Sequence, residues 1–580
     1  MNNLSITMAQ IRTKPGSVWY NHDVIVKYIK MAADQVDNTK PQLLVFPEMA
    51  IPGYPALDLY LNSEFIRNCE KSLNDITKIT GDYPNIMVVV GSLELLDDRL
   101  YNSAYVLNAG QVKKIVRKTL LPEYDIFFEK RYFNSAPITD MDNTIYFYGN
   151  KIGILVCEDL WDENYSIKPF KEKIIKHHAD VVVSINASPY CIGKVYERIK
   201  RVKDKIRNTN IDKFVYVNAI GGQDGYEGEI VFDGNSFIVD NKGKMYKEGG
   251  AYEKSLTTIY PDAQPEPVLS TKWQNARILR DEMGDVFGAL TMGVKHYFAR
   301  ANTWKAVIGI SGGIDSAVVA WIAAQALGQQ NIKMITMPSQ YSSKETLEDA
   351  FQLMKNLGGG FNRSINSIYR RIYAQLDTNY EDRRSLSHED INPLNMDIKD
   401  GDLTSQNIQA RIRGIILMAY ANANNAMVIS TGNKTELALG YCTLYGDMAG
   451  GISPLADLNK LNVYHLADYI NHAFKTDACP YPIPLGIIKR PPSAELASDQ
   501  TDEATLGDYN IIAPLVDQIV SGDYNLFNLK MDYGADVVQS VAKKIFRNEF
   551  KRRQSPPGIK NSRKAFGSGR RMPWSIDEIY

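Results

Sequence analysis

The chain has no long hydrophobic run and few cysteines. No stretch of about eighteen uninterrupted apolar residues occurs, which is roughly what a membrane-spanning helix needs. The N-terminus, MNNLSITMAQIRTKPG, lacks the cationic start and apolar segment of an export signal. We therefore expect a cytoplasmic protein with no membrane partner. The five cysteines form no CxxC pair and no cluster with histidine, so neither a disulfide framework nor a structural zinc site is expected.

The chain also lacks an excess of charge of one sign. Lys and Arg number 66 and Asp and Glu number 67, which gives a formal net charge of -1. A local basic run from Lys543 to Arg571 could bind RNA, but a solvated tail, or one that binds the phosphates of a small ligand, is the more ordinary interpretation. We therefore expect no nucleic-acid partner.

At 580 residues the chain is too long for one hydrophobic core. Up to about residue 260, apolar β-branched runs such as ADVVVSINAS alternate with amphipathic helix patterns, which predicts a layered α/β domain with mostly buried strands. The proline-rich PDAQPEPVLST then predicts a boundary. We assign 1–262 to a first domain, 263–275 to a linker and 276–580 to a second domain, whose alternating pattern is typical of a doubly wound parallel sheet.

The stretch AVIGISGGIDSAVVAWIAAQAL, residues 306–327, passes from a strand pattern through a turn into a helix pattern. Ser311, Gly312 and Gly313 would gather free backbone N–H groups and the positive end of a helix dipole, which favours an anion such as phosphate. A tight turn that binds nothing is the alternative. The lysine of the usual GxxxxGKS/T triphosphate loop is absent, and Asp315 lies where a carboxylate could hold a metal.

SGGIDSA resembles the signature of the ATP-pyrophosphatase superfamily, whose members cleave ATP between its α and β phosphates to adenylate a substrate. The Gly-rich stretch 430–460 follows the strand AMVIS and resembles the substrate and metal region of NAD synthetases, as do QNIQARIRG, PPSAELASDQTDEATLG and FKRRQSPPGIK. A solvated loop is the alternative for 430–460. The resemblance implies a Rossmann-like domain of the adenine nucleotide alpha hydrolase type.

The same resemblance implies roles for single residues. The residues expected to bind ATP are Gly309, Ile310, Ser311, Gly312, Gly313, Ile314, Asp315, Ser316 and Thr431. Those expected to bind deamido-NAD are Asn407, Arg411, Glu436, Asp447 and Lys551. Asp315 and Glu436 would hold magnesium, which would offset the repulsion between a triphosphate and a dinucleotide carboxylate. Asp502 or Glu503, in a stretch that we interpret as a lid, could reach a second magnesium.

In the first domain three polar residues end strands or border turns: Glu48 in VFPEMAIPGYP, Lys118 in VRKTLLPEYD and Cys157 in GILVCEDLW. Taken singly, each has an ordinary structural interpretation, such as a buried cysteine or a surface charge. In this order they resemble the Glu-Lys-Cys set of the nitrilase superfamily, which implies an αββα sandwich. A thiol with a pKa of about 8.5 needs a neighbouring cation and a base before it can attack an amide. Lys118 would supply the cation and Glu48 the base.

The resemblance further implies that Cys157 attacks the side-chain amide of glutamine. Lys118 and a backbone N–H would stabilise the oxyanion, and Glu48 would carry the proton to the leaving ammonia. The residues assigned to glutamine binding and to support of the site are Tyr124, Ser188, Lys194 and Glu129. Arg198, one helical turn from Lys194, could serve the same carboxylate.

Together the motifs resemble the glutamine-dependent NAD synthetases over nearly the whole chain. The implied partners are the small molecules L-glutamine, ATP and deamido-NAD, with magnesium as cofactor and a homo-oligomer as the assembly. Two alternatives remain open. A glutamine-fed ATP-pyrophosphatase acting on another substrate such as tRNA should lack the 430–460 pattern, and a catalytically silent nucleotide sensor should have lost Cys157, Lys118 or Asp315, all of which are present.

Overall fold

The computed structural model describes residues 3–36, 39–137, 140, 142–267, 279–376, 396, 398–399, 401–498 and 500–574. The chain divides into two compact units, one made of Met1–Gly225 with Ile230–Asp285 and the other of Tyr226–Glu229 with Val286–Tyr580. The bounds 1–262, 263–275 and 276–580 stay a prediction, because much of the expected linker lies outside the described residues. Among the described helices, none is long and apolar enough to cross a membrane.

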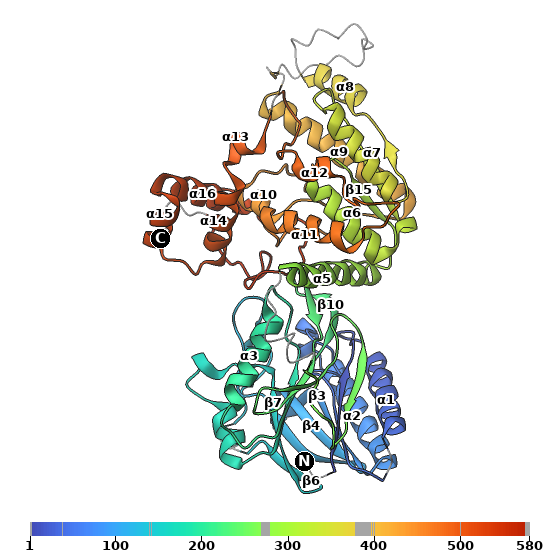
Figure 1. The fold of residues 1–580 in the computed structure, drawn as a ribbon, viewed down its shortest axis with the longest axis vertical. Coiled ribbons are helices and arrows are strands. Elements are labelled where there is room, and N and C mark those ends of the chain that lie inside the picture. The colour runs from blue at the N-terminus through green and yellow to red at the C-terminus, as the bar shows by residue number, and fades with distance from the viewer. Residues whose placement is uncertain are drawn as a thin grey trace. The chain divides into compact units, whose positions relative to one another are not determined.

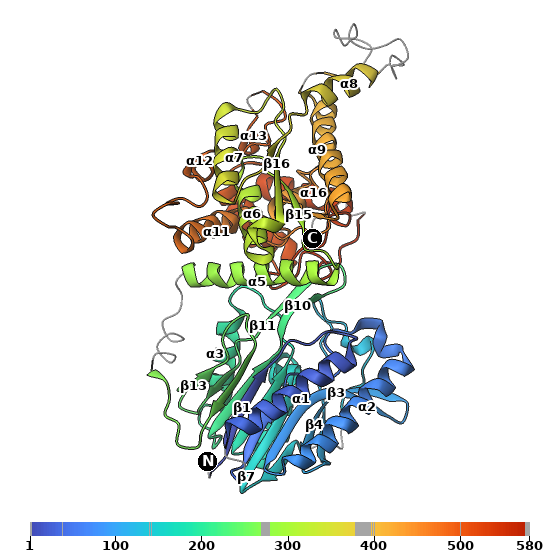
Figure 2. The ribbon, with the colours of Figure 1, turned by 90° about the vertical axis from the view of Figure 1, so that its right-hand side faces the viewer.

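Two six-stranded sheets form the centre of the first unit (Figures 1 and 2). The first sheet contains, in spatial order, β14 (Ser255–Ile259), β1 (Ser5–Gln10), β2 (Gln42–Val45), β3 (Ile86–Leu96), β4 (Arg99–Asn108) and β5 (Gln111–Arg117). The second contains β13 (Met245–Glu248), β12 (Phe237–Val239), β9 (Lys213–Asn218), β8 (Val181–Asn186), β7 (Asn150–Val156) and β6 (Thr144–Phe147). A separate ribbon pairs β10 (Ile220–Asp224) with β11 (Glu229–Asp233). β12 and β13 form an antiparallel hairpin whose turn contains Asn241.

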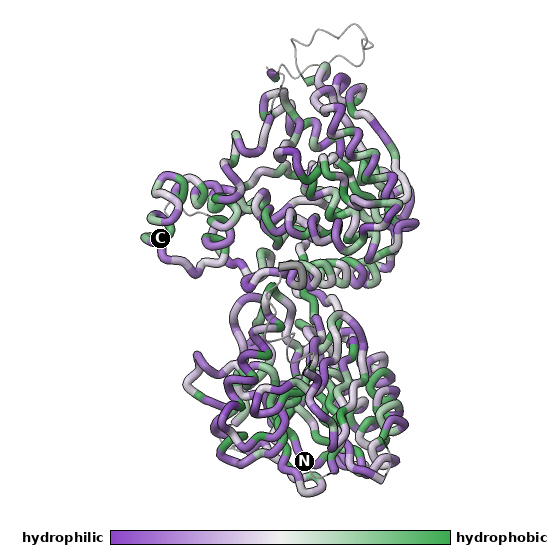
Figure 3. Tube along the Cα trace, viewed as in Figure 1, coloured by the Kyte–Doolittle hydropathy of each residue, from purple (hydrophilic) through white to green (hydrophobic). Residues whose placement is uncertain are grey.

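Side chains from both sheets share one core. Val45 and Val89 of the first sheet cluster with Ile154, Val183 and Val215 of the second, all fully buried. The helices α1 (Val18–Gln35) and α2 (Ser63–Ile79) lie side by side on the outer face of the first sheet, and α3 (Lys194–Ile206) packs on that of the second (Figure 2). The four layers make the predicted αββα sandwich. Strands covered on both faces explain the continuous apolar runs of the sequence, which appear as green segments in Figure 3.

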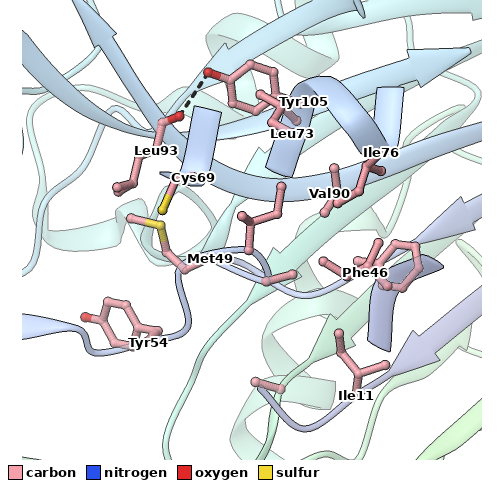
Figure 4. Close-up of a cluster of buried hydrophobic side chains, with 14 of the residues drawn as sticks. Ile11, Phe46, Met49, Tyr54, Cys69, Leu73, Ile76, Val90, Leu93 and Tyr105 are labelled. Carbon is pink, nitrogen blue, oxygen red and sulfur yellow. Dashed lines mark hydrogen bonds between the residues drawn. The ribbon is translucent and has the colours of Figure 1, made fainter. Parts of the chain in front are cut away.

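The core beneath α2 fixes the chain just after β2. Met49 points into a cluster with Cys69, Val90 and Leu93, where Tyr105 donates a hydrogen bond to the Leu93 carbonyl oxygen at 3.0 Å (Figure 4). Gly91 of β3 lies directly against this segment, since a Cβ there would be 2.2 Å from the Met49 nitrogen. The backbone carrying residues 48 and 49 is thus held against β3 with no room to shift.

The second unit contains a four-stranded sheet in the order β17 (Phe361–Asn362), β16 (Ile332–Thr336), β15 (Ala306–Gly309) and β18 (Met427–Val428). All three pairings are parallel. β16 and β17 lie on one side of β15, whereas the later strand β18 lies on its other side. The strand order therefore reverses between β15 and β18. That switch point is where doubly wound sheets bind ligands, and the fold is the one predicted.

Helices surround this sheet. They are α5 (Leu279–Arg300), α6 (Ile314–Leu327), α7 (Lys344–Asn356), α8 (Asn366–Leu376), α9 (Leu403–Asn424), α10 (Lys434–Leu439), α11 (Lys460–Ala473), α12 (Leu485–Lys489), α13 (Asp502–Leu506), α14 (Tyr509–Ser521), α15 (Leu526–Tyr533), α16 (Ala535–Arg547) and α17 (Glu549–Arg552). The segment 361–404 is charged and weakly patterned in sequence, and its described parts hold β17, α8 and the start of α9. The apolar pattern of α8 is weak because only Tyr369, Tyr373 and Ala374 of this helix are buried.

We predict that Gly91→Ala destabilises the first unit and displaces residues 48 and 49, because the new methyl group meets backbone rather than a side chain that can move. Overpacking of this kind costs about 1–3 kcal/mol or more. Gly81→Ala is the matched control, since its nearest neighbour would lie 3.7 Å away. Unfolding midpoints of the two variants measure the difference, and equal midpoints would contradict the close approach.

Candidate active sites

Glu48, Lys118 and Cys157 lie together in the first unit. Glu48 follows β2, Lys118 follows β5 directly and Cys157 follows β7 directly, so both sheets contribute. Their exposed fractions are 2%, 1% and 6%. Fully buried ionisable residues need partners, and here they partner one another.

The Lys118 ammonium is shared by two carboxylates. Its Nζ donates to Oε1 of Glu48 at 2.8 Å and to Oε1 of Glu129 at 2.9 Å. Burial opposes the charged lysine, but Glu129 and Glu48 outweigh burial and hold the pKa of Lys118 well above its usual value. Burial raises the pKa of Glu129 to about 7, with Lys118 opposing the shift. Two carboxylates against one ammonium therefore leave a site that accepts a proton near neutral pH.

Glu48 is held by further donors. Asn102 Nδ2 donates to its Oε1 at 2.7 Å, and the backbone N–H of Ala187 donates to its Oε2 at 2.9 Å. Tyr54 donates to Glu129 at 2.9 Å. With these bonds both carboxylates are fixed in position before any ligand binds.

Cys157 sits at a strained turn. Its φ is 42°, in the left-handed region that residues with a side chain seldom adopt. It begins the short 3-10 turn Cys157–Leu160. Burial raises the pKa of the thiol well above its ordinary value, Glu48 adds to this, and Lys118 opposes it. The resting thiol is therefore protonated, and its activation requires a nearby group that removes the proton.

The carboxylate of Glu158 lies near the thiol, and the cation Lys194 lies near Glu158. Tyr124 and Tyr165 donate to the carboxylate of Glu158, at 3.0 and 2.9 Å. Lys194 lies 3.6 Å from the centre of the Trp161 ring. Sequence reasoning missed Glu158 and Trp161, although both belong to the GILVCEDLW motif that carries the cysteine.

The structure distinguishes Lys194 from Arg198. Arg198 is fully buried and donates from Nη1 to both oxygens of Asp233 at 2.8 Å, while its Nη2 donates to the carbonyl oxygens of Ser188 and Pro189. Its guanidinium is thus already engaged. The Lys194 side chain is 20% exposed and pairs with Glu197 at 3.2 Å. Lys194 is the cation that a ligand carboxylate can reach.

In the second unit a cavity of about 420 Å³ opens at the switch point. The residues predicted to bind ATP, Gly309 to Ser316 and Thr431, all line it. No side chain caps the N-terminus of α6 at Gly313, which leaves first-turn N–H groups for an anion. The packing of the protein itself requires glycine at position 312. Its φ is 82°, and a Cβ there would lie 2.4 Å from the Thr346 carbonyl oxygen of α7, so protein backbone is the close neighbour.

Three charged groups meet at one end of this cavity. Lys460 Nζ lies 2.6 Å from Oδ2 of Asp315 and 2.9 Å from Oε1 of Glu436. Asn433 donates to the other oxygen of Asp315 at 2.9 Å. Burial raises the pKa of Glu436 to about 7, while Lys460 opposes the shift and Asp315 adds to it.

Asp502 lines the same cavity and, among the described residues, its buried Oδ1 has no hydrogen-bond partner. Sequence reasoning missed Lys460.

Most residues predicted to bind the dinucleotide line the cavity too. Asn407 and Asp447 both contact Thr443, which donates its hydroxyl to the first and its N–H to the second, at 2.8 and 2.7 Å. Lys551 also lines the cavity and donates to the carbonyl oxygens of Gly440 and Cys442.

Arg411 differs from the other predicted residues. It is exposed, does not line the cavity and donates to the Leu444 carbonyl oxygen at 3.3 Å. Arg413, two residues along α9, lines the cavity instead and donates to the Met337 carbonyl oxygen. Burial lowers the pKa of Arg413 to about 10, with Glu495 opposing. Its environment therefore favours an anionic ligand.

Known proteins match both halves of the chain. A carbon-nitrogen hydrolase family model matches residues 5–272, and an NAD synthase family model matches 286–555. Glutamine-dependent NAD(+) synthetases of Synechocystis and Aquifex aeolicus are 35% and 33% identical, each match covering 98% of this chain and 98% or 99% of the relative. A solved glutamine-dependent NAD+ synthetase from Acinetobacter baumannii, in complex with ADP, is 29% identical with a TM-score of 0.71, over 99% of both chains.

We predict that Arg198→Met lowers the free energy of unfolding much more than Lys194→Met does. Removing Arg198 leaves the buried Asp233 unpaired, which costs about 3–5 kcal/mol. Removing the partly exposed Lys194 should change the free energy of unfolding by about 1 kcal/mol or less. Denaturant unfolding of the two variants measures this, and a stable Arg198→Met would show that the buried pair is not what holds this end of α3.

Proposed function

Because the chain belongs to the family of glutamine-dependent NAD+ synthetases, we propose that its two sites perform the two halves of one reaction. The chain is an ATP-using ligase that makes NAD+ with glutamine as the amide donor. In the proposed scheme ATP adenylates the nicotinate carboxylate of deamido-NAD with release of pyrophosphate. Ammonia from glutamine then displaces AMP, giving NAD+, while glutamine becomes glutamate.

One observation supports this scheme most strongly. The chain holds both a buried Glu48-Lys118-Cys157 set and a cavity lined by the SGGIDSA turn with Asp315 and Glu436. An ATP-pyrophosphatase that acts on tRNA is not favoured, since the relatives that match the full chain are NAD+ synthetases. Homo-oligomeric assembly and a cytoplasmic location are also part of the proposal.

In the first site Glu48 takes the proton of the Cys157 thiol as sulfur attacks the amide carbon of glutamine. Lys118 stabilises the oxyanion. The carbon–nitrogen bond breaks as Glu48 returns the proton to the leaving nitrogen, which departs as ammonia. Water then hydrolyses the glutamyl thioester. Glu129 supports Lys118, to which it is hydrogen bonded.

Glutamine carries both an ammonium and a carboxylate, and the site offers a partner to each. Glu158, held by Tyr124 and Tyr165, would accept the ammonium. Lys194 would bind the carboxylate together with Ser188. Charges of opposite sign beside the thiol would select a free amino acid over a simple amide.

In the second site the first turn of α6 and Thr431 would bind the ATP phosphates. Asn407, Asp447, Glu436 and Lys551 would contact deamido-NAD, and Arg413 is a better-placed cation than Arg411.

Magnesium chemistry fits the donor set of this cavity. Asp315 and Glu436 already attract one cation, the ammonium of Lys460. Magnesium is usually held by one or two carboxylates completed by substrate phosphates and water. Within the described part of the chain, no three acidic, His or Cys side chains form a cluster that could hold a metal ion. Asp315 and Glu436 would hold the ion, which would neutralise phosphate charge, and Lys460 could then turn to the phosphates. A second magnesium near Asp502 or Glu503 stays a prediction.

We predict that Cys157→Ala loses glutamine-driven NAD+ formation by about 100-fold or more, because the nucleophile is gone. Ammonium-driven formation should stay at the native rate. Cys69→Ala, which removes another buried thiol of the same unit, is the control and should keep both activities. Assays of NAD+ from deamido-NAD, ATP and magnesium with either donor measure this. If the native chain makes no NAD+ with either donor, the proposal fails.

We predict the reverse pattern for Asp315→Asn. NAD+ formation should fall about 100-fold or more with both donors, because the phosphate site loses a charged ligand that both routes need. Glutamate release from glutamine should continue. The same assays with glutamate detection test this. Loss confined to the glutamine route would contradict the assignment of Asp315 to the ATP site.

A further inference from the structure

Asp159 is a buried carboxylate with no part in the chemistry proposed above. It is fully buried and lies two residues after Cys157, in the 3-10 turn Cys157–Leu160. Burial of a carboxylate is costly unless its oxygens are hydrogen bonded. We therefore asked which groups it contacts.

Its partners are on the other sheet, next to Lys118. Oδ1 of Asp159 accepts the backbone N–H groups of Thr119 at 3.0 Å and of Leu120 at 2.8 Å, and Oδ2 lies 3.3 Å from the Thr119 nitrogen. Thr119 and Leu120 directly follow Lys118 in the chain. Asp159 thus joins the turn that carries the nucleophile to the segment that carries the cation.

The backbone of Lys118 has two other anchors. Its N–H donates to the Asn102 carbonyl oxygen at 2.8 Å, and its carbonyl oxygen accepts the Ala136 N–H at 2.9 Å. The bond to Asn102, which lies in β4, holds Lys118 to the first sheet, and the bond to Ala136 holds it to the segment that follows. Cys157 ends β7 of the second sheet. The position of Lys118 relative to Cys157 therefore depends on contacts that connect the two sheets, such as the hydrogen bonds of Asp159.

The charge of Asp159 is poorly compensated. Two nearby cations, Lys173 and Lys118, act on it. The buried Nζ of Lys173 has no hydrogen-bond partner within the described residues, and Lys118 donates to Glu48 and Glu129, so neither forms a close pair with Asp159. Burial raises the pKa of Asp159 to about 7, and the Leu120 N–H and Lys173 oppose the shift. The Asp159 side chain therefore contributes mainly a well-placed hydrogen-bond acceptor, and its negative charge contributes less.

We infer that Asp159 is a positioning residue for the glutamine reaction, whose side-chain oxygen sets Lys118 against Cys157 by accepting the N–H groups of Thr119 and Leu120. The inference rests on the proposed function of the first site. Since Asp159 acts through the placement of two reacting groups, its loss should lower kcat for glutamine and leave KM nearly unchanged. A shift of about 1 Å at a reacting group can cost about 100-fold.

Four variants of the full chain test this inference. Asp159→Ala removes the acceptor, and Asp159→Asn keeps an oxygen of the same shape without the charge. Asp240→Ala is the matched control, because Oδ1 of Asp240 also accepts two backbone N–H groups, those of Lys242 and Lys244, in the hairpin between β12 and β13. Cys157→Ala reports on the proposed function itself. Each is assayed for kcat and KM with glutamine and for ammonium-driven NAD+ formation, and the three variants that keep Cys157 are also assayed for its alkylation rate by iodoacetamide.

We expect Asp159→Ala to lower kcat with glutamine about 10- to 100-fold and the alkylation rate in parallel, with KM changed about 2-fold or less. Asp159→Asn should stay within about 5-fold of the native kcat. Asp240→Ala should match the native chain, and ammonium-driven NAD+ formation should be native in both Asp159 variants and in Asp240→Ala.

Several results would overturn the inference. One is native kcat in Asp159→Ala, another is a loss that appears only in KM, and a third is an equal loss in Asp240→Ala. If Asp159→Ala does not fold, Asp159→Asn decides, because a folded Asn variant as inactive with glutamine as Cys157→Ala would show that charge and not the acceptor is required. Cys157→Ala that still uses glutamine would instead refute the proposed function.

Discussion

Both sites depend on one buried ammonium shared by two carboxylates. In the first unit Lys118 lies between Glu48 and Glu129, and in the second Lys460 lies between Asp315 and Glu436. A buried charge is tolerated only when it is paired and hydrogen bonded, so each cluster is stable only as a set. Burial, helped by the second carboxylate, raises the pKa of one carboxyl group in each cluster to about 7, Glu129 in one and Glu436 in the other, with the lysine opposing the shift.

The position of these clusters follows from the sheets. Parallel strands buried on both faces leave their polar chemistry to the loops at their ends. Cys157 comes directly after β7, and the SGGIDSA turn comes directly after β15. Rigid strands then fix the spacing of groups that loops alone would hold loosely. Gly91 and Gly312 show the same constraint, since each allows a backbone segment of the site to pack against its neighbour.

The sequence predicted those helices and strands whose own residues carry a clear apolar pattern. The helix expected at 314–327 is α6 with the same bounds, and the strand before Cys157 is β7. The Glu-Lys-Cys set was found because each member lies in a motif of several residues. Lys460 was missed because it pairs with Asp315 across 145 residues and stands in the short, unremarkable LNK. The sequence could not decide whether Lys194 or Arg198 binds the ligand carboxylate, because the answer depends on the ion pair of Arg198 with the buried Asp233. These two residues are 35 positions apart and lie in different elements, so no sequence spacing predicts that they pair.

The two clusters, alike in composition, would be used in opposite ways. In the proposed reaction of the first, the ammonium of Lys118 would stay in place while a proton moves from sulfur to Glu48, so fixed geometry is an advantage, and Asn102 and Ala187 hold Glu48 in position. In the proposed reaction of the second, a cation and an anionic nucleotide would enter a place where Lys460 already pairs with Asp315 and Glu436. The lysine would then exchange carboxylates for phosphate. A long, flexible side chain that carries a compact charge suits such an exchange better than the planar guanidinium of arginine, which is consistent with lysine at this position and with arginine at the fixed, fully buried position 198.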